Sequence, residues 1–271
     1  MNMLKNWIKI LYLTLLGLTL VACGQSSSQE DTSLRDVTED GKLVVATETG
    51  FAPFVFKTLV DSKDTVVGSD VEMVKKIAED LGVELDISEM SFDNVLSTVQ
   101  SGKADIGISG ISVTEERKKV FDFSIPYYTA TNKLIIKKTD SQKLIVLDAF
   151  SGLSVAAQKG SIQESVVKEQ LAEAHLISLT HTGEMINQLK NGQVAAVVLE
   201  EPIAKGYVEK NPDLMIADIE LDSSASDAYA IALPKGSTAL KAEIDKVLQK
   251  LIDSGQIEQM IQEAYDLSIK D

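Results

Sequence analysis

From Gly41 to its end, the chain alternates between short apolar segments and amphipathic segments that close on a glycine. Residues 43–47 and 194–199 are short apolar runs, as is typical of buried strands. Residues 69–82 carry apolar side chains on one helical face and end at a glycine, which is a helix stop signal. Strands that alternate with helices form mostly parallel sheets with helices on both faces, so the pattern predicts an α/β fold.

The remaining segments continue this alternation. We expect further strands over residues 83–87, 104–109, 134–138, 153–158, 175–179 and 228–235. We expect helices over residues 93–102, 161–173, 183–192 and 202–210, followed by two helices at the C-terminus. The length of this region is sufficient for one large α/β domain or for two lobes of ordinary size.

Two segments of the chain, residues 95–109 and 185–199, align with each other without a gap. Each contains a predicted helix, a glycine stop, a turn and a strand that ends at polar residues. One interpretation is that any helix–turn–strand unit looks like this. The other is that the protein has two similar lobes, each of which presents functional groups at the C-terminal end of a strand, where open parallel sheets bind ligands.

The segment 1–22 has the pattern of a secretory signal peptide. Lys5 and Lys9 accompany an apolar run that is short for a membrane span and ends at small residues. The run ends at Leu-Val-Ala-Cys23, which resembles the lipobox at which bacterial lipoproteins are lipidated. The alternative is that Cys23 is a small hydrophobic residue of the signal peptide. Cys23 is the only cysteine, so a disulfide within the chain is excluded.

Residues 24–40 are polar, rich in serine and almost free of apolar side chains. This composition cannot offset the entropy of ordering, so we expect residues 23–40 to be a flexible tether between the lipid and the folded part. We therefore expect the protein to be anchored by lipid to the outer face of the cytoplasmic membrane, at the cell surface or in the periplasm. The net charge of −15 disfavours binding to nucleic acid or to anionic lipid, so the lipid should be the only membrane contact.

The sequence lacks the motifs of the common hydrolases, nucleotide-binding enzymes and metalloenzymes. HExxH, GxSxG, the Walker loop and Cys/His clusters are absent, and the only histidines are His175 and His181. We expect no metal, no cofactor and no catalytic residue.

One arginine stands out in the stretch SGISVTEERKK. Ser112 and Glu115 have the spacing of a capping box, so a helix should begin at Ser112 or Thr114. Arg117 would lie one turn inside this helix, close to its free N–H groups and the positive end of its dipole. An arginine beside such N–H donors can hold a carboxylate with two parallel hydrogen bonds.

Small residues precede this arginine and would let a ligand reach the backbone. They include Ser109 and Gly110, which follow the predicted strand at 104–109. The alternative is that Arg117 forms a surface ion pair with Glu116 or Asp122, as most exposed arginines do.

Four stretches of the chain resemble the polar amino-acid-binding proteins of ABC importers, which are type II periplasmic binding proteins. They are TETGFAPFVF (47–56), VGSDVEMVKKIAEDLG (67–82), SGKADIGISGISVTEERKKVFDFSIPYY (101–128) and AYAIALPKGS (228–237). The T-x-E-R…FS-x-PYY block is the most specific, and the resemblance covers nearly all of residues 41–271.

The resemblance implies a two-lobed type II periplasmic-binding-protein fold, in which each lobe is a mostly parallel sheet flanked by helices. The first lobe would comprise residues 41–130 and 228–271, and the second lobe would comprise residues 131–227. Two extended crossings, near 129–134 and 222–229, would join them.

The resemblance also implies a ligand site between the lobes. Arg117, the arginine of T-x-E-R, would clamp the α-carboxylate of an amino acid. Ser112 would add hydrogen-bond donors and Gly110 a carbonyl acceptor. The α-ammonium would meet an acid at the end of a second-lobe strand, either Glu200 or its neighbour Glu201.

Other positions of the resemblance concern the second lobe and the ligand side chain. The loop AQKGSIQ would donate the N–H groups of Ser161 and Ile162 to the carboxylate, and Gln158 occupies a position that varies with the ligand. Phe51 and Phe92 would be aromatic plates around the ligand side chain. Without the resemblance, Phe92 would be interpreted as a core residue or as part of a hydrophobic staple.

Glu48 lies where relatives carry an acid that contacts the end of the ligand side chain. An acid there favours Arg, Lys, ornithine or His, but it could equally accept a hydrogen bond from the amide of Gln. Flat aromatic plates suit a guanidinium, an amide or an aliphatic stem.

The resemblance therefore implies a substrate-binding lipoprotein, expected to be monomeric. It would capture a free polar amino acid, neutral or cationic, with Arg, Lys, His and Gln as the main candidates. It would deliver this ligand to the transmembrane subunits of an ABC permease. The alternatives are a dehydratase-like enzyme that acts on small carboxylic acids with the same fold, or a surface sensor or adhesion lipoprotein.

Overall fold

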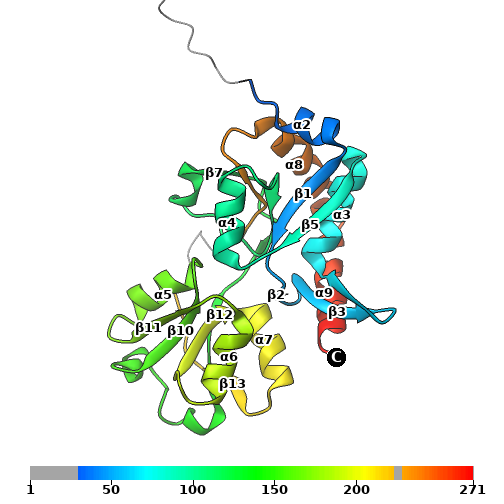
Figure 1. Cartoon of the computed structure of the whole chain (residues 1–271). Coiled ribbons are helices and arrows are strands. Elements are labelled where there is room, and N and C mark those ends of the chain that lie inside the picture. Colours follow the sequence, from blue (N-terminus) through cyan, green and yellow to red (C-terminus); the bar gives the residue numbers. More distant parts are fainter. Residues whose placement is uncertain (1–29, 223–227, 271) are drawn as a thin grey trace, which may run out of the picture. The chain divides into compact units, whose positions relative to one another are not determined.

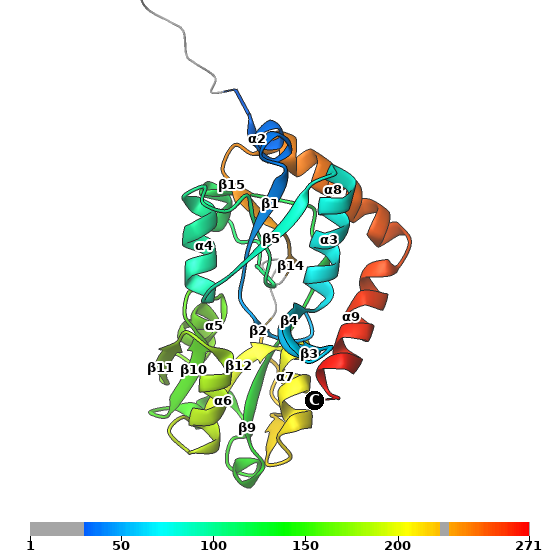
Figure 2. The same ribbon diagram turned by 45° about the vertical axis from the view of Figure 1, so that its right-hand side comes forward.

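The structure is a computed structural model that describes residues 30–222 and 228–270. The predicted signal peptide, Cys23 and the beginning of the predicted tether lie outside the described residues. From Asp31 on, the chain forms one compact unit. Within this unit, the two views in Figures 1 and 2 show two sheets, each with its own helices.

The first lobe is built around a five-stranded sheet in the order β5-β1-β6-β15-β7. These strands are β1 (Lys42–Thr47), β5 (Glu84–Glu89), β6 (Ile106–Gly107), β7 (Phe121–Phe123) and β15 (Ala232–Pro234). Its helices are α3 (Ser69–Leu81), α4 (Phe92–Gln100), α8 (Thr238–Asp253) and α9 (Gln256–Ser268). Leu43 and Val45 pack in the core with α3, α8 and α9, whereas Ala46 packs with α4, so the sheet is covered on both faces.

The second lobe contains a five-stranded sheet in the order β11-β10-β12-β9-β13. These strands are β9 (Asn132–Lys137), β10 (Ser154–Gln158), β11 (His175–Leu179), β12 (Ala196–Glu200) and β13 (Leu214–Ile216). Its helices are α5 (Gln163–Gln170), α6 (Thr182–Lys190) and α7 (Glu201–Lys210), with short 3-10 turns at η2 (Lys138–Asp140) and η3 (Leu147–Phe150). The predicted strands and helices of both lobes are therefore present, although β6 and α5 are shorter than expected.

The two sheets have the same plan, which favours the interpretation of two similar lobes over a generic match. Val45 pairs with Ile106 in the first sheet, and Val155 pairs with Ala196 in the second. Ile106 and Ala196 are equivalent positions in the gapless alignment of residues 95–109 with 185–199. The repeated sequence segments thus occupy equivalent places, because each supplies the central strand of its sheet, β6 or β12.

The α/β fold is confirmed, and each sheet is mostly parallel with one reversed strand. In each, four strands run in one direction, and the fourth strand in the order, β15 or β9, pairs antiparallel with both of its neighbours. The reason is the route of the chain: β9 and β15 follow directly on the segments that pass between the lobes, so each enters its sheet from the opposite end. These segments pair as β8 (Tyr128–Thr129) and β14 (Ala228–Tyr229), at the regions expected to cross.

An antiparallel hairpin sheet, β2 (Gly50–Phe51), β3 (Val55–Val60) and β4 (Lys63–Val67), separates β1 from α3. The sequence pattern does not predict it. The turn between β3 and β4 is made by Asp61 and Ser62, both with positive φ, at 50° and 62°. Two such residues form the tight turn that a two-residue hairpin needs.

The tether prediction is wrong for residues 31–40. Ser33–Asp40 form helix α2, which lies against α8. Asp31 accepts hydrogen bonds at Oδ2 from the Ala239 N–H (2.6 Å) and the Thr238 hydroxyl (2.7 Å), and it therefore caps the start of α8. Val37 is buried, with 2% of its surface exposed. These contacts with distant residues supply the order that the local composition does not.

The helices that the structure describes are all too short or too polar to traverse a lipid bilayer. Within the same residues, no group of His, Cys, Asp and Glu side chains is arranged to hold a metal ion.

Candidate ligand site between the lobes

The segment around Arg117 is a single 3-10 turn, not the predicted α-helix. This turn, η1 (Arg117–Lys119), begins only after Thr114. Thr114 accepts a hydrogen bond at Oγ1 from the Arg117 N–H (3.0 Å), and its carbonyl accepts one from the Lys118 N–H (2.9 Å). The capping-box prediction at Ser112 is therefore wrong. Thr114 organises the turn instead, because the chain enters β7 immediately afterwards and leaves no room for a second turn.

Arg117 lies at the boundary of the two lobes. Its Nη1 donates to the Ser112 carbonyl (2.7 Å) in its own lobe, and its Nη2 donates to the Gly160 carbonyl (2.9 Å) in the other. The guanidinium carbon lies 5.6 Å from the centre of the Phe92 ring, a cation–π distance. Burial lowers the pKa of Arg117 to about 10, against the attraction of Glu200 and Glu116, so the group stays charged at neutral pH. The surface ion pair considered from sequence is thus not the arrangement found.

Arg117 lines a small cavity between the lobes. Ten of the eleven predicted site residues line this cavity, and Gln163, which was not predicted, lines it with them. The lining residues are Phe51, Phe92, Ser109, Gly110, Ser112 and Arg117 from the first lobe and Gln158, Ser161, Ile162, Gln163 and Glu200 from the second.

Glu48, the eleventh predicted residue, lies just after β1 and is buried, with 3% of its surface exposed. Its Oε1 accepts a hydrogen bond from the Gly50 N–H (2.9 Å), while Oε2 is buried and meets no hydrogen-bond partner among the described residues. Burial raises the pKa of this carboxyl, and the Gly50 N–H, His181 and Gln158 offset part of the increase. One oxygen is therefore left to accept a proton donor from outside the chain.

Tyr207, on α7 of the second lobe, also contacts this region and was not predicted from sequence. Its hydroxyl lies 3.5 Å from the Gly50 carbonyl, and burial together with the charge of Glu48 raises its pKa to about 12. In sequence it is one more apolar position of a helix, so only the contact between the lobes reveals it.

The two candidate acids at the end of β12 have different surroundings. Glu200 lines the cavity and has 6% of its surface exposed. Glu201 accepts hydrogen bonds from Lys205 (2.6 Å) and from Thr131 (2.9 Å), which lower its pKa. Glu200 is therefore the acid that can meet a ligand in the cavity.

The second-lobe side of the cavity is the loop between β10 and α5. Ser161 donates both its hydroxyl (2.7 Å) and its N–H (3.1 Å) to the Gln158 carbonyl, so its N–H is used within the loop and is not open to a ligand as the resemblance implied. The Gly160 N–H donates to Glu164 Oε2 (3.1 Å). The N–H groups of Ile162 and Gln163 meet no acceptor within residues 30–222 and 228–270. A helix start with open N–H groups is suited to bind an anion.

A buried aspartate supports the first-lobe side of the cavity and was also missed, because in sequence it looks like an ordinary first-turn residue of α3. Asp70 Oδ2 accepts hydrogen bonds from the Tyr127 hydroxyl (3.1 Å) and the Gly110 N–H (3.4 Å). Burial raises the pKa of Asp70 to about 7. Gly110 has a φ of +58°, and a Cβ there would lie 2.3 Å from the Phe51 ring. Glycine is therefore required where the aromatic ring meets the loop.

Comparisons with known proteins agree with this geometry. The model of the bacterial extracellular solute-binding proteins, family 3, matches residues 43–266. The arginine-binding extracellular protein ArtP of Bacillus subtilis is 32% identical over 262 residues, which are 95% of this chain and 96% of the relative. A probable histidine-binding protein of Campylobacter jejuni is 29% identical over 98% of both chains.

Among solved structures, this chain is similar to the amino acid ABC transporter substrate-binding protein AbpA of Streptococcus pneumoniae bound to L-arginine. The two share 52% identity with a TM-score of 0.85, over 88% of this chain and 100% of the other.

Proposed function

The chain belongs to the bacterial extracellular solute-binding proteins of family 3, and from this membership we propose that it binds a free amino acid for an ABC importer. The observation that carries the proposal is the pair of opposite charges at one cavity: Arg117 on the first lobe and Glu200 on the second. A zwitterion presents a carboxylate and an ammonium, and these two side chains would bind one each.

The second-lobe loop would complete the carboxylate site. The N–H groups of Ile162 and Gln163 lie at the start of α5, where the helix dipole favours negative charge. Ser112 would contribute donors from the first lobe, whereas Gly110 would contribute a carbonyl acceptor for the ligand ammonium, as the resemblance implies. Closure of the lobes removes water from these charges, and their attraction to the ligand is then stronger than in solution.

We propose L-arginine as the preferred ligand. Glu48 keeps one buried oxygen without a hydrogen-bond partner in the described part of the chain, and Phe51, three positions further along, lines the cavity. A guanidinium would satisfy that oxygen with charge as well as a hydrogen bond, and it would offset the cost of burying the carboxylate better than a neutral side chain could. ArtP and the solved relative of S. pneumoniae, which is bound to L-arginine, support this choice.

A role in binding rather than catalysis is also supported. The family is one of solute-binding proteins, and the charged residues of the cavity already have ligand-binding roles in the proposal. We further propose that Cys23 is lipidated and tethers the protein to the outer face of the membrane, beside the permease. Loss of membrane association in a Cys23→Ser variant would test the anchor.

A thermal-shift screen tests the proposed function. A form of the chain that begins at Gly24 retains the complete compact unit, and it is unfolded and refolded to remove carried ligand. It is then heated with each standard amino acid, ornithine, citrulline and cystine. At a hundred times its dissociation constant, a ligand should stabilise the protein by about 2.7 kcal/mol, a shift of several degrees.

The largest shift is expected with L-arginine. A shift with glutamine alone would make Glu48 an amide acceptor and would contradict the arginine assignment. The absence of a shift with every amino acid would contradict the proposed function and favour an enzyme of the same fold.

A further inference from the structure

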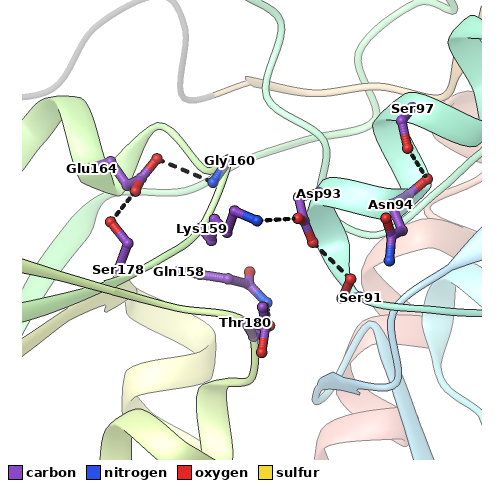
Figure 3. Close-up of polar contacts among 10 residues, drawn as sticks. All are labelled: Ser91, Asp93, Asn94, Ser97, Gln158, Lys159, Gly160, Glu164, Ser178 and Thr180. Atoms are coloured by element: carbon purple, nitrogen blue, oxygen red, sulfur yellow. Dashed lines mark hydrogen bonds and ion pairs between the residues drawn. The ribbon is translucent and has the colours of Figure 1, made fainter.

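An ion pair joins the two lobes beside the cavity. Lys159 Nζ lies 2.9 Å from Asp93 Oδ2. Asp93 is in the first turn of α4 in the first lobe, and Lys159 follows β10 in the second. Figure 3 shows the two side chains pointing toward each other across the boundary. Neither residue lines the cavity, so neither is placed to touch the ligand.

The Asp93 side chain and the backbone of Lys159 are each held within their own lobe. Asp93 accepts a hydrogen bond at Oδ1 from the Ser91 hydroxyl (2.7 Å), which leaves Oδ2 for the lysine. The Lys159 N–H donates to the Leu179 carbonyl (2.8 Å), and Glu164 braces the next residue through the Gly160 N–H (3.1 Å). The Asp93 carboxylate is thus held ready for the lysine, whereas the Lys159 side chain is ordered only when the lobes meet. The pair therefore depends on the approach of the lobes.

The backbone is also close at this point. A Cβ at Gly160 would lie 3.3 Å from the Cβ of Asp93, and the Gly160 carbonyl accepts the hydrogen bond from Arg117 Nη2 (2.9 Å). The loop that carries Lys159 thus meets both α4 and the proposed carboxylate clamp. Separation of the lobes would break the ion pair and the Arg117 contact together.

The charges at this boundary are complementary. The Lys159 ammonium, with the Ser91 hydroxyl, lowers the pKa of Asp93, and Asp93 raises the pKa of Lys159. Glu164 is the other charged group that acts on Lys159. Both partners are ionised at neutral pH, and the attraction opposes opening of the lobes.

We propose that Asp93 and Lys159 form a latch that slows the release of a bound amino acid without contacting it. The inference rests on the proposed function, since it concerns the retention of that ligand. The side chains of Lys159 and Asp93 are 56% and 25% exposed, so the latch is partly screened by water. Exposed ion pairs of this kind change an equilibrium by about two- to fivefold.

The test is the dissociation rate of L-arginine, measured by dilution of the radiolabelled complex into unlabelled arginine. Asp93→Asn and Lys159→Gln should each release arginine about three times faster than the unchanged protein. The difference should become smaller in about 1 M salt, where the screening length falls to about 3 Å. The matched control is Glu115→Gln. It removes one negative charge from an exposed ion pair, with Lys118 (2.6 Å), that lies within the first lobe alone.

The exchanged variant Asp93→Lys with Lys159→Asp reverses the pair and should restore slow release. Single variants that release arginine at the rate of the Glu115→Gln control would overturn the latch. So would an exchanged variant that remains as fast as the single ones, because the effect would then come from each residue separately.

Small-angle X-ray scattering of the ligand-free protein separates failure of the latch from failure of the proposed function. The radius of gyration reports the separation of the lobes and needs no bound amino acid. Asp93→Asn and Lys159→Gln should each increase it, whereas Glu115→Gln should leave it unchanged. An increase in a protein that fails to bind arginine would support the latch and contradict the proposed ligand. A radius that stays unchanged in a protein that binds arginine would overturn the latch alone.

Discussion

The two lobes have equivalent strand orders, but the helix that follows β1 in the first lobe and the helix that follows β10 in the second are used in opposite ways. In the first lobe, the β2–β4 hairpin sheet lies between β1 and α3. The first N–H groups of α3, those of Ser69 and Asp70, donate to the carbonyls of Pro53 (3.1 Å) and Phe54 (3.0 Å). In the second lobe, β10 is followed by α5 after four residues, and the N–H groups of Ile162 and Gln163 at the start of that helix meet no acceptor in the described chain.

The inserted hairpin therefore converts one helix start into a scaffold and leaves the other as a candidate binding site. The covered helix carries its own carboxylate, Asp70, which holds the Gly110 loop and Tyr127. At the start of the open helix, Gln163 is neutral and donates to Asn132 (2.7 Å). A shared topology thus does not imply a shared role, because the groups that a helix start binds depend on what covers it.

The largest expected effect is the loss of amino-acid affinity on substitution of Arg117, the charged residue that the first lobe adds to the cavity. Arg117→Ala should weaken amino-acid binding by about 100-fold or more, because the ligand carboxylate would lose its charged partner in a desolvated site. The ligand-free protein should keep its fold. Titration calorimetry measures the affinity and circular dichroism the fold. Arg117→Lys keeps the charge but not the paired donors, so its affinity should lie between that of Arg117→Ala and that of the unchanged protein. Binding at the unchanged affinity in Arg117→Ala would exclude the arginine from the site.

Asp70, at the covered start of α3, should make the stability of the protein depend on pH. Burial raises the pKa of Asp70 to about 7. The folded state therefore holds this proton where the unfolded chain has released it, and stability from this group falls as the pH rises from about 4 to about 7. Asp70→Asn does not titrate at this position. The free energy of unfolding of Asp70→Asn, relative to that of the unchanged protein, should therefore be about 2.5 kcal/mol higher at pH 8 than at pH 5.

Urea denaturation at the two pH values measures this difference. The control is Asp86→Asn, which removes an exposed carboxylate that pairs with Lys42 (3.5 Å) on the same sheet. A stability difference between Asp70→Asn and the unchanged protein that is equal at pH 5 and pH 8 would show that Asp70 is not held protonated by burial.

Substitution of Glu200, the charged residue that the second lobe adds to the cavity, should lower the affinity less than substitution of Arg117. Glu200→Gln removes the charge opposite the ligand ammonium but keeps an acceptor, and affinity should fall about 30-fold, or about 2 kcal/mol. Glu201→Gln, at the neighbouring position bound to Lys205 and Thr131, is the matched control and should bind almost normally. Equal losses in the two variants would remove the distinction between the two acids.

The smallest effect concerns a contact that only the first lobe has. Asp31→Ala removes the cap of α8 and should lower the stability by about 1 kcal/mol, or about 2–4 °C in the melting temperature. Glu39→Ala, on the exposed side of α2, is the control. A variant of Asp31 that melts with the control would show that α2 is not needed to hold the start of α8.

The sequence by itself determined the features that depend on neighbouring residues. Gly82 adopts a φ of +70° at the end of α3, as its position in the apolar pattern predicts. The alternation of strands and helices predicted nearly every element of both sheets. The resemblance to amino-acid-binding proteins selected eleven site residues, and ten of them line one cavity.

Only the tertiary structure decided the features that depend on distant residues. Asp31 looks like part of a disordered segment until α8, more than two hundred positions away, supplies the N–H group whose hydrogen bond it accepts. Asp70 looks like an ordinary helix start until Gly110 and Tyr127 bury it, and the link between Asp93 and Lys159 exists only because two lobes meet. Local patterns encode how the backbone folds, whereas burial and the pairing of charges depend on contacts that no short segment contains.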